Sequence, residues 1–180
     1  DALFHTFGQD FSAHRTIIDE WYNHYHFHKA RRESIVNSDM ALYYLKSLVG
    51  IGAPPDELID HNVRIDYGKL RHLVQIDRRL NGNFSRLREI IDTGEQVGVI
   101  QTSFPVEGLL RQENFISLLY YLGLLTFAGE QEGAPLLRIP NRTVQQLMYS
   151  YLREGYRDAE VFKPNTWDLA EKLRHMAYRG

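Results

Sequence analysis

The sequence predicts a mainly α-helical chain with one small antiparallel β-hairpin, arranged as a helical bundle plus a winged-helix-like subdomain. Two observations predict this fold. Over most of the chain, apolar residues recur at spacings of three and four, the period of a helix with one buried face. Near residue 130, the short apolar runs LLTFA and PLLRI flank the turn GEQEG, a pattern typical of a β-hairpin.

Composition narrows the class of protein. The 180 residues are 43% hydrophobic, enough for a real core. A net charge of -2 gives no general attraction to nucleic acid or to a membrane. There is no cysteine, which excludes disulfides, thiolate catalysis and cysteine-based zinc sites and suits a cytoplasmic protein. The longest apolar runs are too short or too interrupted to span a bilayer, so we expect no membrane partner.

The first half of the chain predicts several helices. The first covers residues 10–26, and the second is capped by Asn37 or Ser38 and runs through Val49. The apolar side of the second helix is predicted to carry Leu42, Leu45, Leu48 and Val49. After the helix-breaking stretch GIGAPPDEL, a third helix is predicted from Asp66, with an inward stripe of Leu70, Leu73, Val74 and Leu80. The stretch NGN ends it, and Asn83 is predicted to cap a short helix over residues 84–92.

The second half of the chain has a different pattern of apolar spacing. An apolar helix, QENFISLLYYLG, is predicted to end at Gly123, and the hairpin follows it. Asn141, after Pro140, is predicted to cap the next helix, and Asn165 opens the last one with Asp168 in capping-box spacing. The charge bias and the helical pattern both change near residues 94–103. This change predicts a helical subdomain over 1–96 and a winged-helix-like subdomain with a C-terminal helix over 97–180, or a single unit in which the two pack closely together.

The stretch WYNHYHFHK places His24, His26 and His28 at alternate positions. On a β-strand the three rings would lie on one face, as metal ligands can. On a helix, alternate residues are about 200° apart and do not converge. Because the preceding pattern favours a helix, we expect solvated or hydrogen-bonded imidazoles here rather than a metal site.

Basic residues gather between positions 64 and 88, where only Asp66 and Asp77 oppose them. They are candidates for a nucleic-acid-binding face that contacts phosphates. The alternative is a solvated helix face, or one turned toward the acidic stretch from Glu89 to Glu132. The candidate residues are Arg64, Lys69, Arg71, Arg78, Arg79, Arg86 and Arg88.

The winged-helix-like half has little of the chemistry needed to read DNA. Its candidate recognition helix, QENFISLLYYLG, contains no Arg or Lys, and the wing carries Glu130 and Glu132, which repel phosphates. Such an apolar, aromatic element suits packing against another domain. The chain also lacks a G-x-x-x-x-G-K-[ST] loop, G-x-S-x-G and H-E-x-x-H, so no catalytic residue is assigned.

Several motifs, in order, resemble a family of bacterial proteins in which a P-loop, AAA-like ATPase domain precedes a PD-(D/E)XK nuclease-like domain. The resemblance runs from about residue 15 to the end of the chain. Its motifs are WYNHYHF, VNSDMALYYL, PPDELIDHNVRIDYGKLRHLV, LNGNFSRLREII, SFPVEGLLRQENFISLLYYLGLLTF and LRIPNRTVQQLMYSYLREGYRD.

The resemblance implies that this chain is the helical, winged-helix-like C-terminal part of the ATPase region. The phosphate-binding lysine would then lie before Asp1 and the nuclease residues after Gly180, as expected for a segment of a longer protein. No cofactor is implied for this segment, whereas ATP and Mg²⁺ are implied for the parent protein. The implied partners are the ATPase core and the nuclease-like domain of the same chain. The family motif residues, expected to be structural, are Trp21, Tyr22, Asn23, Tyr25, Phe27, Asn37, Pro140 and Asn141.

The chain departs from the family pattern at three positions. His24 stands where the family usually has Gly, His26 where it usually has Arg, and Val36 where a Tyr is more usual before Asn37. The histidines are therefore substitutions in a structural motif. If the family's Arg serves a phosphate or a partner, His26 puts that role in doubt. The function we expect is non-catalytic coupling of nucleotide state to the neighbouring domain, and the alternative is nucleic-acid binding through the basic residues 64–88.

Overall fold

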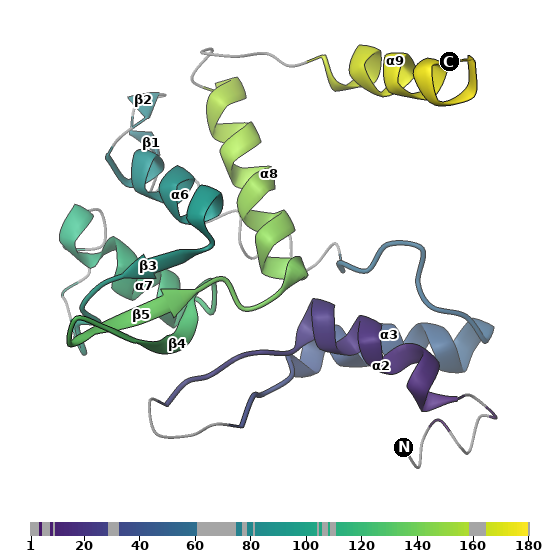
Figure 1. The fold of residues 1–180 in the computed structure, drawn as a ribbon, viewed down its shortest axis with the longest axis horizontal. Coiled ribbons are helices and arrows are strands. Elements are labelled where there is room, and N and C mark those ends of the chain that lie inside the picture. Colours follow the sequence, from purple (N-terminus) through teal and green to yellow (C-terminus); the bar gives the residue numbers. More distant parts are fainter. Residues whose placement is uncertain are drawn as a thin grey trace.

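The predicted mainly α-helical fold with a small antiparallel sheet is confirmed (Figure 1). A computed structural model describes residues 4, 8, 10–28, 33–60, 75–76, 79–80, 82–103, 105, 108, 111–158 and 165–179. Within these residues, no helix combines the length and the apolar character needed to cross a bilayer.

Two helices that lie side by side form the N-terminal part (Figure 1). Helix α2, Phe11–Tyr22, is capped by the side chain of Asp10, which accepts from the Ser12 amide at 2.9 Å. Helix α3, Ser38–Ile51, is capped by Asn37, as predicted, and ends where Gly52 turns left-handed with φ of 72°. The first predicted helix ran four residues too far, because α2 ends at Tyr22 and Asn23 is already in extended conformation.

The predicted apolar side of α3 was wrong in part. Leu48 is buried, but Leu42 and Val49 are exposed. The helix instead buries positions spaced by four, Met40, Tyr44 and Leu48. Tyr44 sets this rotation, since its ring packs edge-on against Tyr22 of α2 at a centroid distance of 6.0 Å.

A short antiparallel pair of strands replaces the end of the predicted third helix. Strand β1, Gln75–Ile76, pairs with β2, Arg79–Leu80, in the register Gln75 to Leu80. Cross-strand pairing takes the place of the i to i+4 bonds of a helix, so the helix predicted through Leu80 was wrong there. The rest of that prediction, including Asp66, Leu70, Leu73 and Val74, lies outside the described residues.

The second half contains a three-stranded antiparallel sheet. Helix α6, Gly82–Thr93, confirms the predicted short helix, although Asn83 lies inside its first turn rather than capping it. Strand β3, Glu95–Val97, follows, and then η3, Gln112–Asn114, and α7, Phe115–Tyr121. The strands lie in the order β3-β5-β4. The remaining elements are β4, Thr126–Gln131, β5, Ala134–Arg138, α8, Arg142–Asp158, and α9, Thr166–Arg179.

The predicted hairpin is confirmed, with a tighter turn than predicted. Strands β4 and β5 are joined through Glu132 and Gly133, whose φ angles are 52° and 81°. Positive φ at both central residues is the geometry that matches the right-handed twist of a hairpin. Because β3 spans residues 95–97 and pairs with β5, the sheet takes residues from both sides of the proposed boundary at 96 and 97, and that boundary stays a prediction.

Side chains bond the backbone along the outer edge of β3. The Thr93 hydroxyl lies 2.7 Å from the Glu95 carbonyl and 2.9 Å from the Glu89 carbonyl and donates to one of them, and the Gln96 side-chain amide donates to the Val97 carbonyl at 2.7 Å. Gly94 and Gly98 form backbone hydrogen bonds with β5 and the residue that follows it. Successive residues of a strand point their carbonyls to opposite sides, and Glu95 and Val97 are each an odd number of residues from these glycines. Their carbonyls therefore point away from β5. The edge is thus occupied by the protein's own side chains.

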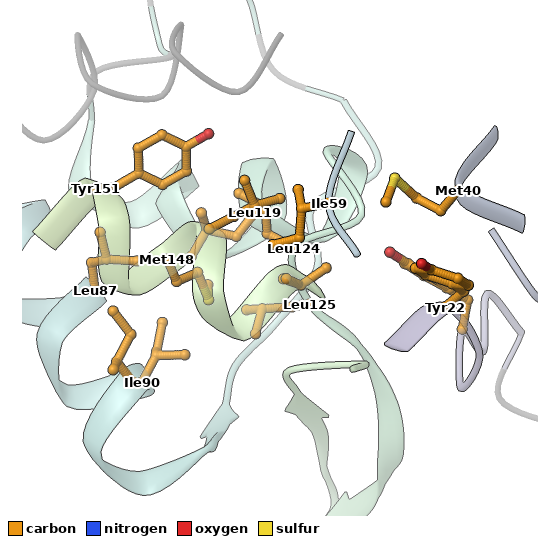
Figure 2. Close-up of a cluster of buried hydrophobic side chains, with 14 of the residues drawn as sticks. Tyr22, Met40, Ile59, Leu87, Ile90, Leu119, Leu124, Leu125, Met148 and Tyr151 are labelled. Carbon is orange, nitrogen blue, oxygen red and sulfur yellow. The ribbon is translucent and has the colours of Figure 1, made fainter. Parts of the chain in front are cut away.

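One continuous core joins the two halves (Figure 2). Helix α8 lies at its centre, because both α2 and α6 pack against it. Figure 2 shows side chains from α6, α7 and α8 meeting next to the sheet, with Ile59 between this group and the N-terminal helices. The labelled buried residues are Tyr22, Met40, Ile59, Leu87, Ile90, Leu119, Leu124, Leu125, Met148 and Tyr151.

The approach of α6 to α8 gives a stability prediction. A Cβ built on Gly155 of α8 would lie 2.6 Å from the buried Phe84 ring. We expect Gly155→Ala to lower the free energy of unfolding by about 1–3 kcal/mol, because the ring has to move. Gly50→Ala in α3, where a Cβ meets nothing within 4 Å, is the matched control.

The control change should raise the free energy of unfolding by about 0.5–1 kcal/mol, because alanine loses less backbone entropy than glycine in a helix. Urea denaturation of the two variants measures both effects. Equal effects of the two substitutions would show that α6 and α8 do not pack as closely as described.

Candidate functional site

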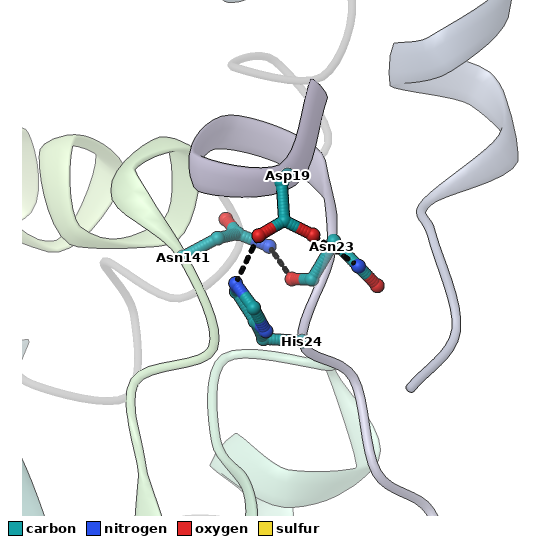
Figure 3. A network of polar contacts seen from close by, with 4 residues as sticks. All are labelled: Asp19, Asn23, His24 and Asn141. Carbon is teal, nitrogen blue, oxygen red and sulfur yellow. Dashed lines mark hydrogen bonds and ion pairs between the residues drawn. The ribbon is translucent and has the colours of Figure 1, made fainter. Parts of the chain in front are cut away.

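The carbonyl groups at the end of α2 are bonded by residues from two other parts of the chain, the start of α3 and the start of α8. The Thr143 hydroxyl of α8 donates to the Trp21 carbonyl at 2.7 Å, and the Asn37 amide donates to the Tyr22 carbonyl at 2.7 Å. The Asn141 side chain donates to the Asn23 carbonyl at 2.9 Å (Figure 3). We call this set the junction: Trp21, Tyr22, Asn23, Asn37, Asn141 and Thr143.

The two asparagines of the junction each do a second task. The Asn37 side chain caps α3 by accepting from the Met40 amide at 3.1 Å. The Asn141 side chain caps α8 by accepting from the Val144 amide at 3.1 Å, and Pro140 beside it is buried. The predicted caps are confirmed, and each cap also holds the end of α2.

A tyrosine hydroxyl and an ion pair reinforce the junction. The Tyr22 hydroxyl donates to the Leu58 carbonyl at 2.9 Å, and burial raises the pKa of Tyr22 well above its usual value, so the donor proton is retained. Arg142 of α8 lies 3.2 Å from Glu20 of α2. This ion pair is exposed and contributes less than the buried bonds.

The histidine stretch leaves α2 through a left-handed residue. His24 has φ of 73°, and its Nε2 lies 3.4 Å from the Asp19 carboxylate (Figure 3). The Asn23 side-chain amide also donates to the Asp19 carboxylate, at 2.7 Å. His24 thus occupies a backbone conformation that favours glycine. The same residue breaks the regular alternation that would put three imidazoles on one face.

Beyond His24 the chain lies between β4 and residue 35. Tyr25 and Ile35 exchange backbone hydrogen bonds of 3.2 and 2.9 Å. On the other side, the Phe127 amide donates to the His26 carbonyl at 3.2 Å, and the Thr126 hydroxyl bonds the His26 backbone. The predicted helix was wrong over this stretch, which one backbone hydrogen bond holds beside β4. Among the described residues, no group of three His, Asp or Glu is placed to hold a metal ion.

An aromatic groove of about 660 Å³ opens beside this stretch. Its defining members come from four segments, and we call it the aromatic groove: Phe27, Val99, Ile100, Tyr120, Tyr121 and Phe127. The Tyr120 hydroxyl donates to the Phe27 carbonyl at 3.0 Å, and burial, followed by the neighbouring Tyr121, raises the pKa of Tyr120. Phe27, Tyr121 and Val99 are 49%, 51% and 71% exposed, so the groove presents apolar surface to solvent.

A second groove, of about 360 Å³, shares Phe27 and Tyr121 with the first. Tyr25, Ile35, Asn37 and Leu122 help to line it, together with Asp39. All eight family motif residues therefore lie at the junction, next to it or along these grooves, although they are up to 120 positions apart.

The basic candidates are described only in part. The Arg86 side chain donates to the Gln112 carbonyl at 2.9 Å, and Arg88 lies 3.6 Å from Asp92 and 3.5 Å from the Tyr156 hydroxyl. Arg79 lies in β2. Arg64, Lys69, Arg71 and Arg78 lie outside the described residues, so their nucleic-acid role stays a prediction.

Sequence patterns did not single out Thr126, Thr143 and Tyr120. Each contributes one hydroxyl to a distant backbone, and no local spacing marks Thr126 or Tyr120. The Thr at the second position of a capped helix, Thr143, is the only one with a local signal, because the end of a helix is where neighbouring segments meet.

Comparisons with protein-family models, with curated protein sequences and with solved structures found no match to this chain.

The left-handed turn gives one prediction. We expect the melting temperature of His24→Gly to be at least that of the unsubstituted chain. The free energy of unfolding of His24→Ala should be about 1 kcal/mol lower than that of His24→Gly, since alanine adopts positive φ poorly. Thermal denaturation followed by circular dichroism measures both variants. The exposed contact with Asp19 contributes little, so its loss should not reverse this order.

The double role of Asn141 gives a second prediction. Asn141→Ala removes the cap of α8 and the bond to α2, and should lower the free energy of unfolding by about 2 kcal/mol. Asn141→Asp keeps the cap acceptor but loses the donor to Asn23, so we expect roughly half that loss. Asn165→Ala, at the cap of the exposed helix 166–179, is the control. A loss in the control as large as that of Asn141→Ala would remove the argument for the junction.

Proposed function

We propose that this chain is a non-catalytic, winged-helix-like lid segment of a P-loop ATPase whose longer chain also carries a nuclease-like domain. In this proposal, the segment couples nucleotide state to its neighbour by packing between domains. The chain has no phosphate-binding loop of its own, so ATP and Mg²⁺ would be held by the preceding domain. The strand order β3-β5-β4, with α7 before the hairpin, supports the winged-helix comparison.

The observation that carries the proposal is the mixed origin of the aromatic groove. Phe27 belongs to the stretch that leaves α2, whereas Tyr120, Tyr121 and Phe127 belong to the sheet half. A domain seated in this groove contacts both halves at once. Its binding energy would depend on how the halves are placed, which is the requirement for coupling.

A short path connects the groove to the helices. Phe27 is held by Tyr120 through its carbonyl, and its ring stacks on Tyr25 at 5.8 Å. Tyr25 is bonded to Ile35, two residues before the Asn37 cap of α3. A partner that shifts Phe27 therefore acts on α3 through backbone hydrogen bonds. Two arrangements of this path would provide the bistable element.

Hydrogen–deuterium exchange on the full-length protein tests the proposal. With a non-hydrolysable ATP analogue, we expect backbone amides of residues 25–28 and 126–127 to change in protection. Phe27→Ser plus Tyr121→Ser should reduce this change at least about threefold, because the groove loses its two most prominent rings. Ile51→Ser, at an exposed apolar residue of α3 outside the grooves, is the control.

Unchanged exchange on nucleotide binding would contradict the proposal, as would ATP turnover by this segment alone. The nucleic-acid alternative predicts a different result. In that case the segment binds duplex DNA with steep salt dependence, and Arg78→Glu plus Arg79→Glu weakens the binding.

A further inference from the structure

The second groove combines one carboxylate with three aromatic rings. Asp39, in the first turn of α3, is the only carboxylate among its described lining residues, and these residues include no Lys, Arg or His. The rings belong to Tyr25, Phe27 and Tyr121. Aromatic faces attract cations, and they also cover the apolar stem of a long basic side chain. The lining therefore favours an occupant that is positively charged at one end and apolar along its length.

The rings of this groove are held in place by the chain itself. The Phe27 ring stacks on the buried Tyr25 ring at 5.8 Å, with 17° between their planes. The Tyr121 hydroxyl donates to the Gln101 carbonyl at 2.8 Å. A volume of about 360 Å³ is at the small end for ligand sites in proteins, so the groove suits a single side chain. Because the rings are already ordered, little conformational freedom is lost when the groove is filled.

The Asp39 carboxylate is accessible to a ligand. It is exposed, and within the part of the chain that the structure describes no basic side chain lies at ion-pairing distance from it. The start of a helix carries about half a positive charge, which the full negative charge of Asp39 outweighs. The groove therefore attracts a cation and repels an anion.

We propose that the second groove binds an arginine side chain of a partner protein. A guanidinium group is planar, so it stacks on an aromatic ring and donates two parallel hydrogen bonds to a carboxylate such as that of Asp39. A lysine ammonium group is a compact, strongly hydrated charge that gains less from an aromatic face. Because Phe27 and Tyr121 line both grooves, one partner can fill the aromatic groove and place its arginine in the second.

Titration of the isotopically labelled chain with the peptide acetyl-Ala-Arg-Ala-amide, followed by amide NMR at low salt, tests the site. A single side chain should bind with a dissociation constant of roughly 1–10 mM. The signals that move should belong to residues 25–27, 35–39 and 121–123. The same peptide with citrulline in place of arginine keeps the shape without the charge, and should bind about fivefold more weakly.

Substitutions separate the two parts of the site. Asp39→Asn should weaken binding of the arginine peptide about threefold to tenfold, since it removes the charge and keeps the size. Asp168→Asn is the matched control, because Asp168 also lies in the first turn of a helix capped by an asparagine, α9, and loses the same interaction with the helix dipole. Phe27→Leu keeps an apolar side chain without the ring and should weaken binding about threefold.

Three results would overturn the proposal: no shifted signals at about 20 mM peptide, equal binding of the citrulline peptide, or an equal loss of binding in Asp168→Asn. Arg31 and Arg32 lie outside the described residues, and Arg31→Gln plus Arg32→Gln should leave peptide binding unchanged. Tighter binding in this variant would assign the groove to the chain's own arginines and also overturn the proposal. No nucleotide is present in the titration, so its outcome is separate from that of the exchange experiment.

Discussion

The rest of the structure depends on how the last carbonyl groups of α2 are satisfied. A helix leaves its final carbonyls without partners inside the helix, and here three of them are bonded from outside. The partners come from the start of α3 and from the first turn of α8. The end of one helix thereby fixes where two others begin. This explains why α2, α3 and α8 share one core although their connections differ greatly in length.

The same arrangement places the aromatic groove. Once α2 ends, the chain turns at His24 and is held beside β4, which brings the Phe27 ring to Tyr120 and Tyr121. The groove therefore exists only while the two halves keep their relative position. A binding surface that depends on this placement is suited to sensing it, and this is the physical basis of the lid function proposed for the chain.

Local features were predictable from the sequence, and features set by distant contacts were not. Asn37 and Asn141 cap helices through bonds that span three residues, so spacing alone identifies them. The buried face of α3 depends on the contact of Tyr44 with another helix, and the prediction there was wrong in part. The groove joins Phe27 to Tyr120 across 93 positions. No periodic pattern reports a contact of that range.

The outer edge of β3, where side chains bond the backbone carbonyls, affects how this protein behaves when it is concentrated. Fibre growth by strand addition requires backbone groups ready to accept an incoming strand. At this edge the Gln96 side chain bonds one outward carbonyl and the Thr93 hydroxyl lies beside the other, so an incoming strand has to displace them first. Strand addition at the β3 edge should therefore be slower than at an edge whose outward carbonyls have no side-chain partner.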